Sequence, residues 1–143
     1  MTEPQSETAA KPKGDLRDEY LDASENVRHW SSLRFAQLTV FIAITAGLFA
    51  ALFQSQTVPQ DPIRLIMEIA GLLITAIFWI MEERTMNYWR TFIDRAAKLE
   101  AELGYHQYSS ARRPGEGYIT SANAIRLLFL LLGFFWIAAM IWF

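Results

Sequence analysis

The chain has 143 residues, of which 52% are hydrophobic and 20% charged, and its formal net charge is -2. One domain fits this length, and the composition is apolar for a soluble protein but typical of a small membrane protein with polar ends. The absence of cysteine excludes disulfides, thiol catalysis and cysteine-ligated metals, and the charge gives no sign of nucleic-acid binding. Only His29 and His106 could supply imidazole, and no close cluster of histidines and carboxylates appears in the sequence, so we expect no metal site and no cofactor.

Residues 1–14 are polar and rich in Pro, Ser, Thr and Lys. They lack the apolar centre of a signal peptide, so we expect a disordered tail. Residues 15–143 then form a single helical membrane domain. Asp15 is a plausible N-cap for its first helix, which we expect over 15–34.

Three apolar runs are long enough to cross a bilayer of about 30 Å, which takes roughly 20 helical residues. They cover residues 35–53, 63–81 and 125–143, and Ser121 is a plausible N-cap that starts the third helix at 121. The link QSQTVPQDP between the first two runs contains two prolines and predicts a short turn. The fold class expected is therefore an all-α membrane protein with three transmembrane helices.

Lysine and arginine placement predicts the orientation of these spans. Basic residues flank the first span on its N-terminal side and fill the segment between spans two and three, whereas only Arg64 lies near the short turn. We therefore expect the N-terminus and the middle segment in the cytoplasm, and the C-terminus on the opposite side of the membrane.

Both cytoplasmic extensions carry a heptad seam of apolar residues. The second span continues without a helix breaker to residue 103, and Gly104 is placed as a C′ glycine. The seams predict a cytoplasmic, coiled-coil-like stalk in which two antiparallel helices pack together. Two helices cannot enclose so many aromatic side chains, which favours further partners, most simply copies of the same chain. The seam residues are Leu16, Tyr20, Ala23, Val27 and Trp30 in the first helix, and Trp89, Phe92, Ala96, Leu99 and Leu103 in the second.

The segment 104–120 must return from the stalk to the membrane over about 30 Å. We expect it to lie along the stalk or across a neighbouring subunit, anchored by Tyr105, Tyr108 and Tyr118. Its basic residues Arg112 and Arg113, with Arg126 at the start of the third span, are expected to contact lipid headgroups.

Glu68 is a carboxylate inside the second apolar run, and three interpretations of it stay open. It could line a pore or an ion site in an oligomer, because intramembrane acids usually face protein or water. It could pair with Arg64, one helical turn away, near the outer headgroups. A contact between subunits is the third interpretation.

Small residues at four-residue spacing in the first span permit close approach of another helix. The stripe consists of Ala43, Gly47 and Ala51, and Gly71 with Thr75 makes a shorter version in the second span. We expect these residues to serve either the hairpin contact or the packing of subunits.

The stretch YWRTFIDRAAKLEAELGYHQY resembles the small octameric bacterial membrane proteins of the RipA type. The residues that carry the likeness are Tyr88, Trp89, Arg95, Leu99, Glu100, Leu103 and Gly104, with ENVRHW at residues 25–30 adding a weaker match. The two-span SLATT-type membrane proteins are similar more loosely, since the third span departs from their pattern. The RipA-type resemblance implies a homo-oligomer in the bacterial inner membrane, an octamer if it follows the family, and transfers no site residues.

No nucleophile is paired with a base and a third orienting group in the sequence, so we do not expect an enzyme. The leading hypothesis is a homo-oligomeric membrane protein with a structural, membrane-organising role. One alternative is an ion channel or pore-forming effector with Glu68 on the path. Another is an accessory subunit of a larger membrane complex.

Overall fold

A computed structural model of the chain describes residues 13–53, 61–110 and 120–142. It contains three helices: α1 (Lys13–Phe53), α2 (Asp61–Leu103) and α3 (Ser121–Trp142). Each is long and apolar enough to cross a membrane. The structure thus confirms an all-helical chain with three candidate membrane spans.

The two long helices continue from apolar into charged sequence without interruption. At about 1.5 Å per residue, the 41 residues of α1 and the 43 residues of α2 each extend roughly 60 Å. Pro62 occupies the first turn of α2, where its missing N–H removes no helical hydrogen bond. At the other end, Gly104 follows the last helical residue with a φ of 75°, the left-handed geometry of a C′ glycine.

Two helix starts differ from the expected ones. Helix α1 begins at Lys13, so Asp15 lies in the first turn and is not the N-cap. At α3 the capping side chain belongs to Thr120, whose Oγ1 accepts a hydrogen bond from the backbone N–H of Asn123 at 3.2 Å, and Ser121 is already helical. Both shifts are within the usual fraying of helix ends.

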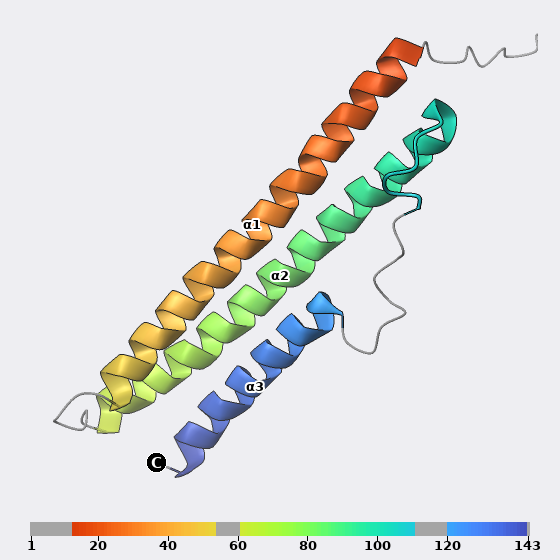
Figure 1. Cartoon of the computed structure of the whole chain (residues 1–143). Helices are drawn as coiled ribbons and strands as arrows, with labels where there is room; N and C mark the ends of the chain where they lie inside the picture. The colour runs from red at the N-terminus through yellow and green to blue at the C-terminus, as the bar shows by residue number, and fades with distance from the viewer. Residues whose placement is uncertain (1–12, 54–60, 111–119, 143) are drawn as a thin grey trace, which may run out of the picture.

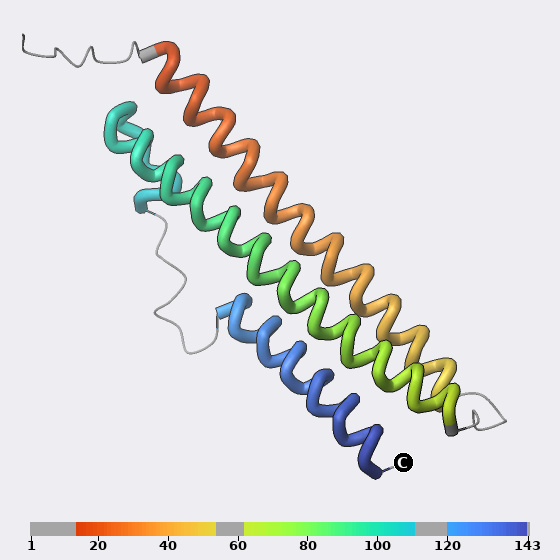
Figure 2. Tube along the Cα trace, turned by 180° about the vertical axis from the view of Figure 1, so that it is seen from behind, coloured from red at the N-terminus to blue at the C-terminus, as the bar shows by residue number. Residues whose placement is uncertain are grey.

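Helix α2 lies between α1 and α3 and runs antiparallel to both (Figures 1 and 2). Within the described residues, the backbones of α1 and α3 do not approach each other closely, and both pack on α2. Aromatic side chains bridge the distance: Phe49 of α1 stacks on Trp136 of α3 with ring centroids 5.2 Å apart, and Phe41 lies 4.9 Å from Phe129. The fold is therefore a long hairpin with a shorter third helix on one side.

The core has one part in the apolar spans and one beyond them. In the spans, Phe41 and Trp136 are fully buried. Beyond them, a smaller cluster joins the far ends of α1 and α2 through Tyr20, Ala23, Ala96 and Leu99. The hairpin contact thus extends over nearly the whole length of both helices.

Candidate functional site: polar layers between the helices

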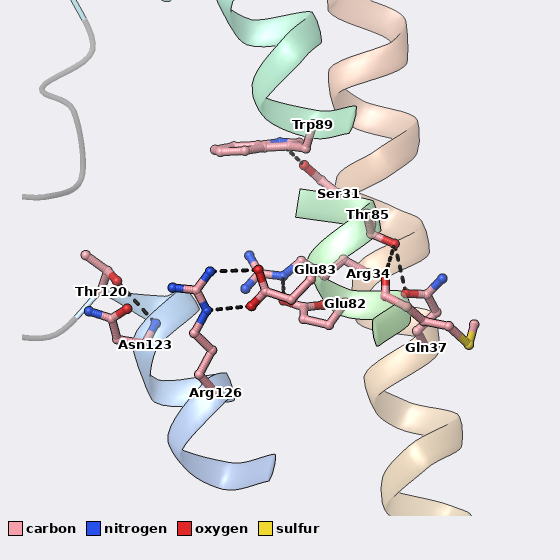
Figure 3. A network of polar contacts seen from close by, with 11 residues as sticks. Ser31, Arg34, Gln37, Glu82, Glu83, Thr85, Trp89, Thr120, Asn123 and Arg126 are labelled. Carbon is pink, nitrogen blue, oxygen red and sulfur yellow. Dashed lines mark hydrogen bonds and ion pairs between the residues drawn. The ribbon is translucent and has the colours of Figure 1, made fainter. Parts of the chain in front are cut away.

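A layer of polar side chains joins α1 to α2 where the apolar part of each helix ends (Figure 3). Arg34 Nε donates to Glu82 Oε1 at 2.5 Å, and both side chains are largely buried. The flanking pairs place Thr85 Oγ1 3.2 Å from Gln37 Oε1, and Trp89 Nε1 3.0 Å from Ser31 Oγ. Three successive pairs of polar side chains therefore fix the register of the hairpin at this level.

The next residue of α2, Glu83, binds the third helix. Arg126 donates through Nε to Oε1 at 2.5 Å and through Nη2 to Oε2 at 2.8 Å, a bidentate pair (Figure 3). Consecutive helical residues point about 100° apart, so Glu82 and Glu83 reach opposite neighbours of α2. Two adjacent carboxylates thus hold α1 and α3 to the central helix.

Arg126 is one of the three arginines that we expect from the sequence to contact lipid headgroups. Arg126 uses two of its guanidinium nitrogens on Glu83, within the chain. Arg112 and Arg113 lie outside the described residues.

Glu68 lies in the span of α2 and is 4% exposed. Its Oε1 accepts a hydrogen bond from Arg64 Nε at 3.0 Å, one turn earlier on the same helix. The carboxylate is covered by the chain's own side chains and does not lie on the outer surface of the hairpin. Of the three interpretations, the pair with Arg64 is the one whose contact the single chain contains.

The two groups of small residues lie in different surroundings. A Cβ added to Gly71 would come within 2.4 Å of Cε2 of the Trp136 indole, so this glycine makes room for α3. Ala43, Gly47 and Ala51 are exposed, and nothing lies within 4 Å of a Cβ placed at Gly47. Gly71 therefore serves a contact within the chain, between α2 and α3, whereas the stripe on α1 lies on the surface.

The seam residues beyond the spans line the contact between α1 and α2. Tyr20, Val27, Ala96 and Leu99 are buried. Phe92, Trp89 and Leu103 are half-buried at the same interface, and the half-buried Trp30 stacks on Tyr88 with ring centroids 4.9 Å apart. The chain's own two helices thus cover much of the surface that the sequence offers to partners.

A second polar site lies at the far end of this contact, around Glu100, which has no exposed surface. We use the term Glu100 cradle for four of its hydrogen-bond donors: the Tyr20 hydroxyl and the backbone amides of Gln107, Tyr108 and Ser109. Their distances to the carboxylate oxygens are 2.8–3.1 Å. The cradle fastens the turn after α2 to both long helices.

The cradle perturbs the ionisation of two of its members. Burial raises the pKa of Glu100, but hydrogen bonds from the backbone of Ser109 and Tyr108 and from the Ser109 and Tyr20 hydroxyls outweigh it, so the pKa lies below its ordinary value. Burial and the bond to Glu100 raise the pKa of Tyr20. Glu100 is therefore a fixed anion, and Tyr20 a neutral donor, throughout the physiological pH range.

Sequence reasoning named some residues of these sites but predicted none of the polar contacts between them, although one signal could have indicated the buried polar positions of α2. Counting back from Trp89 by alternating steps of four and three reaches six buried or half-buried positions of α2: Thr85, Glu82, Phe78, Thr75, Gly71 and Glu68. The seam thus extends through the membrane span with polar residues in core positions. A search for apolar seams ends at the first of these residues. No comparable signal exists for the Glu100 cradle, because three of its four donors are backbone amides of a non-helical turn.

These sites are suited to fixing helices in place. Among the described residues, no group of three or more His, Asp or Glu side chains could hold a metal ion. The ion pairs in Figure 3 bind carboxylates to guanidinium groups of the same chain and hold α1 and α3 to α2. Comparison with family models, with curated proteins and with solved structures finds no match to this chain.

Proposed function

We propose that the chain is a homo-oligomeric integral membrane protein with a structural role, organising the membrane or partner proteins without catalysis. In this proposal the far ends of α1 and α2 form a cytoplasmic stalk, and the C-terminus lies across the inner membrane of a bacterium. The distribution of lysine and arginine supports the orientation, and the resemblance to RipA-type proteins supports the assembly.

The observation that carries the proposal is the open stripe on α1. Phe41 and Thr45 are buried in the chain's helix contacts, whereas Ala43, Gly47 and Ala51 are exposed. In a membrane, helices associate through close backbone approach at small residues, because lipid provides no hydrophobic drive. An exposed row of small residues on a span suits contact with a second copy of the same helix.

The alternatives have weaker support. A path lined by Glu68 needs that carboxylate on an oligomer axis, and in one chain it is 4% exposed and paired with Arg64. An accessory role in a larger complex would use the same stripe for a foreign helix. Purification in mild detergent separates that alternative, because it would recover a second kind of chain in fixed proportion.

Cysteine cross-linking tests the contact directly, since the natural chain has no cysteine and each introduced thiol is unique. We expect Gly47→Cys, or its stripe neighbours Ala43→Cys and Ala51→Cys, to form disulfide-linked dimers in native membranes under mild oxidation. A disulfide requires Cα atoms about 4.4–6.8 Å apart, which only close helix packing provides. The matched control is Ala76→Cys, an exposed alanine in the span of α2, which should stay monomeric.

A steric variant tests whether the assembly depends on the stripe. Gly47 and Gly133 both have open space around an added Cβ, so Gly133→Leu is a matched control for the same substitution at Gly47. Native mass spectrometry should show oligomers for the wild type and for Gly133→Leu, and a shift toward monomer for Gly47→Leu. A wild type that is only monomeric, together with no cross-link at any stripe position, would overturn the proposal.

A further inference from the structure

A shallow hollow of about 360 Å³ lies on the outer side of α2, next to the Glu83–Arg126 pair. Its lining consists of Ala76, Trp79, Ile80, Glu83, Arg84 and Asn87. We propose that this hollow binds one anionic phospholipid. The inference rests on the membrane placement of α2 proposed above and is independent of the number of subunits.

The lining changes in character along the helix. Ala76 and Ile80 belong to the apolar span, whereas Arg84 and Asn87 lie beyond its end. From Ala76 to Asn87 the helix rises about 16 Å, enough for a phosphate group and the first part of an acyl chain. Trp79, which directly precedes Ile80 in the apolar part, is of the residue type enriched at membrane–water interfaces. A ligand that matches both ends must itself be amphipathic.

The charges at the polar end select an anion. Glu83 would repel a phosphate, but its carboxylate is bound by two nitrogens of Arg126, which neutralises it locally. Arg84 is exposed and makes no ion pair with any residue in the described ranges. Arg90, also exposed, follows Glu83 by seven residues, two helical turns, and therefore lies on the same side of α2. The rim is therefore positive, and a guanidinium group suits phosphate oxygens geometrically.

The apolar end decides between a lipid and a free anion. Inorganic phosphate would use Arg84 and Asn87 but would leave Ala76, Ile80 and most of the hollow unused. A phospholipid of the adjoining leaflet covers both parts at once, and it reaches the hollow from the side because the hollow is open along the span. An anionic headgroup is favoured over a zwitterionic one, because the latter carries its own cation beside the positive rim.

Native mass spectrometry of the full chain in mild detergent tests this assignment by titration with phosphatidylglycerol or phosphatidylcholine of the same acyl chains. We expect a saturable first site for phosphatidylglycerol and at least fivefold weaker binding of phosphatidylcholine. Arg84→Gln should weaken phosphatidylglycerol binding about fivefold, the factor expected for one basic residue near an anionic surface. Arg17→Gln removes the same charge from an exposed position near the far end of α1 and should leave binding unchanged.

A second variant blocks the apolar end without changing any charge. Ala76→Phe places a large side chain at the apolar end of the hollow and should weaken the binding of both lipids. Equal affinity for the two lipids, wild-type affinity in Arg84→Gln, an equal loss in Arg17→Gln, or displacement of the lipid by millimolar inorganic phosphate would each overturn the inference. The same spectra report subunit number, so failure of the lipid site and failure of the proposed assembly are distinguishable.

Discussion

Replacing Glu100 by glutamine is expected to release the turn that follows α2. In the wild type, Oε1 accepts from Tyr20 and from the amides of Gln107 and Tyr108, and Oε2 accepts from the amides of Tyr108 and Ser109. A glutamine can keep one oxygen in the first position, but its NH₂ group then faces the Ser109 amide, donor against donor. The substitution keeps the shape of the side chain and removes both the charge and one set of acceptors.

The expected loss follows from the strength of these bonds. A hydrogen bond to a charged group contributes about 1.5–3 kcal/mol, and a buried donor left without an acceptor costs about 1–3 kcal/mol. Because part of the cradle survives in Glu100→Gln, we expect the turn to lose about 2–4 kcal/mol of local stability. At about 1.4 kcal/mol per factor of ten, this corresponds to a roughly 30-fold to 700-fold larger population of the opened turn, and to amide exchange that is faster by the same factor.

Hydrogen–deuterium exchange of the purified chain measures this effect at the amides of residues 107–109. The control is Glu102→Gln, which makes the same chemical change at an exposed side chain two residues further along α2. We expect strong deprotection of the turn in Glu100→Gln and none in Glu102→Gln. Unchanged protection in Glu100→Gln would refute the reasoning, because the carboxylate would then not be holding the turn.

Three further predictions concern pH, the charged layer and the contact of α3. The pKa of Glu100 is lowered in the folded state, so its contribution to the stability of the turn is complete above the ordinary pKa range of glutamate and is lost as the pH falls through the lowered value. Protection of the turn against hydrogen exchange, corrected for the intrinsic exchange rate, should therefore stay constant from pH 8 to about 5. Glu83→Arg or Arg126→Glu alone places like charges side by side and should lower the midpoint of thermal unfolding, by a small amount because both side chains are over a third exposed, and the double variant should recover at least half of the loss. Gly71→Ala should lower the free energy of unfolding by about 1–3 kcal/mol, because the added methyl group displaces the indole of Trp136. Gly133→Ala places its methyl group in open space and should be neutral or slightly stabilising in the same assay.

The number and type of helices follow from the sequence, because long apolar runs without breakers leave little choice. The end of α2 at Leu103 also has a local cause, the glycine that follows it. Each of these features depends on residues that are close in the chain.

The polar layer depends on contacts between residues far apart in the chain. Arg34 and Glu82 are 48 residues apart, and each by itself is typical of the charged border of a span. Only the register of the hairpin shows that they meet, and that register is set by the whole seam. The same holds for the stripe on α1. Its spacing indicates helix packing, but whether it faces another helix of the same chain or the surface depends on where α2 and α3 lie.

The adjacent carboxylates of Glu82 and Glu83 also have a consequence for the order in which the chain enters the membrane. Synthesis delivers α1 and α2 first, and the hairpin contains all its own polar pairs, so it can form before the third helix exists. Arg126 then arrives at a site whose counter-charge is already in place, which offsets the cost of inserting a guanidinium group at the edge of an apolar segment. We therefore expect biogenesis in two steps, with the hairpin as the template on which the last helix is inserted.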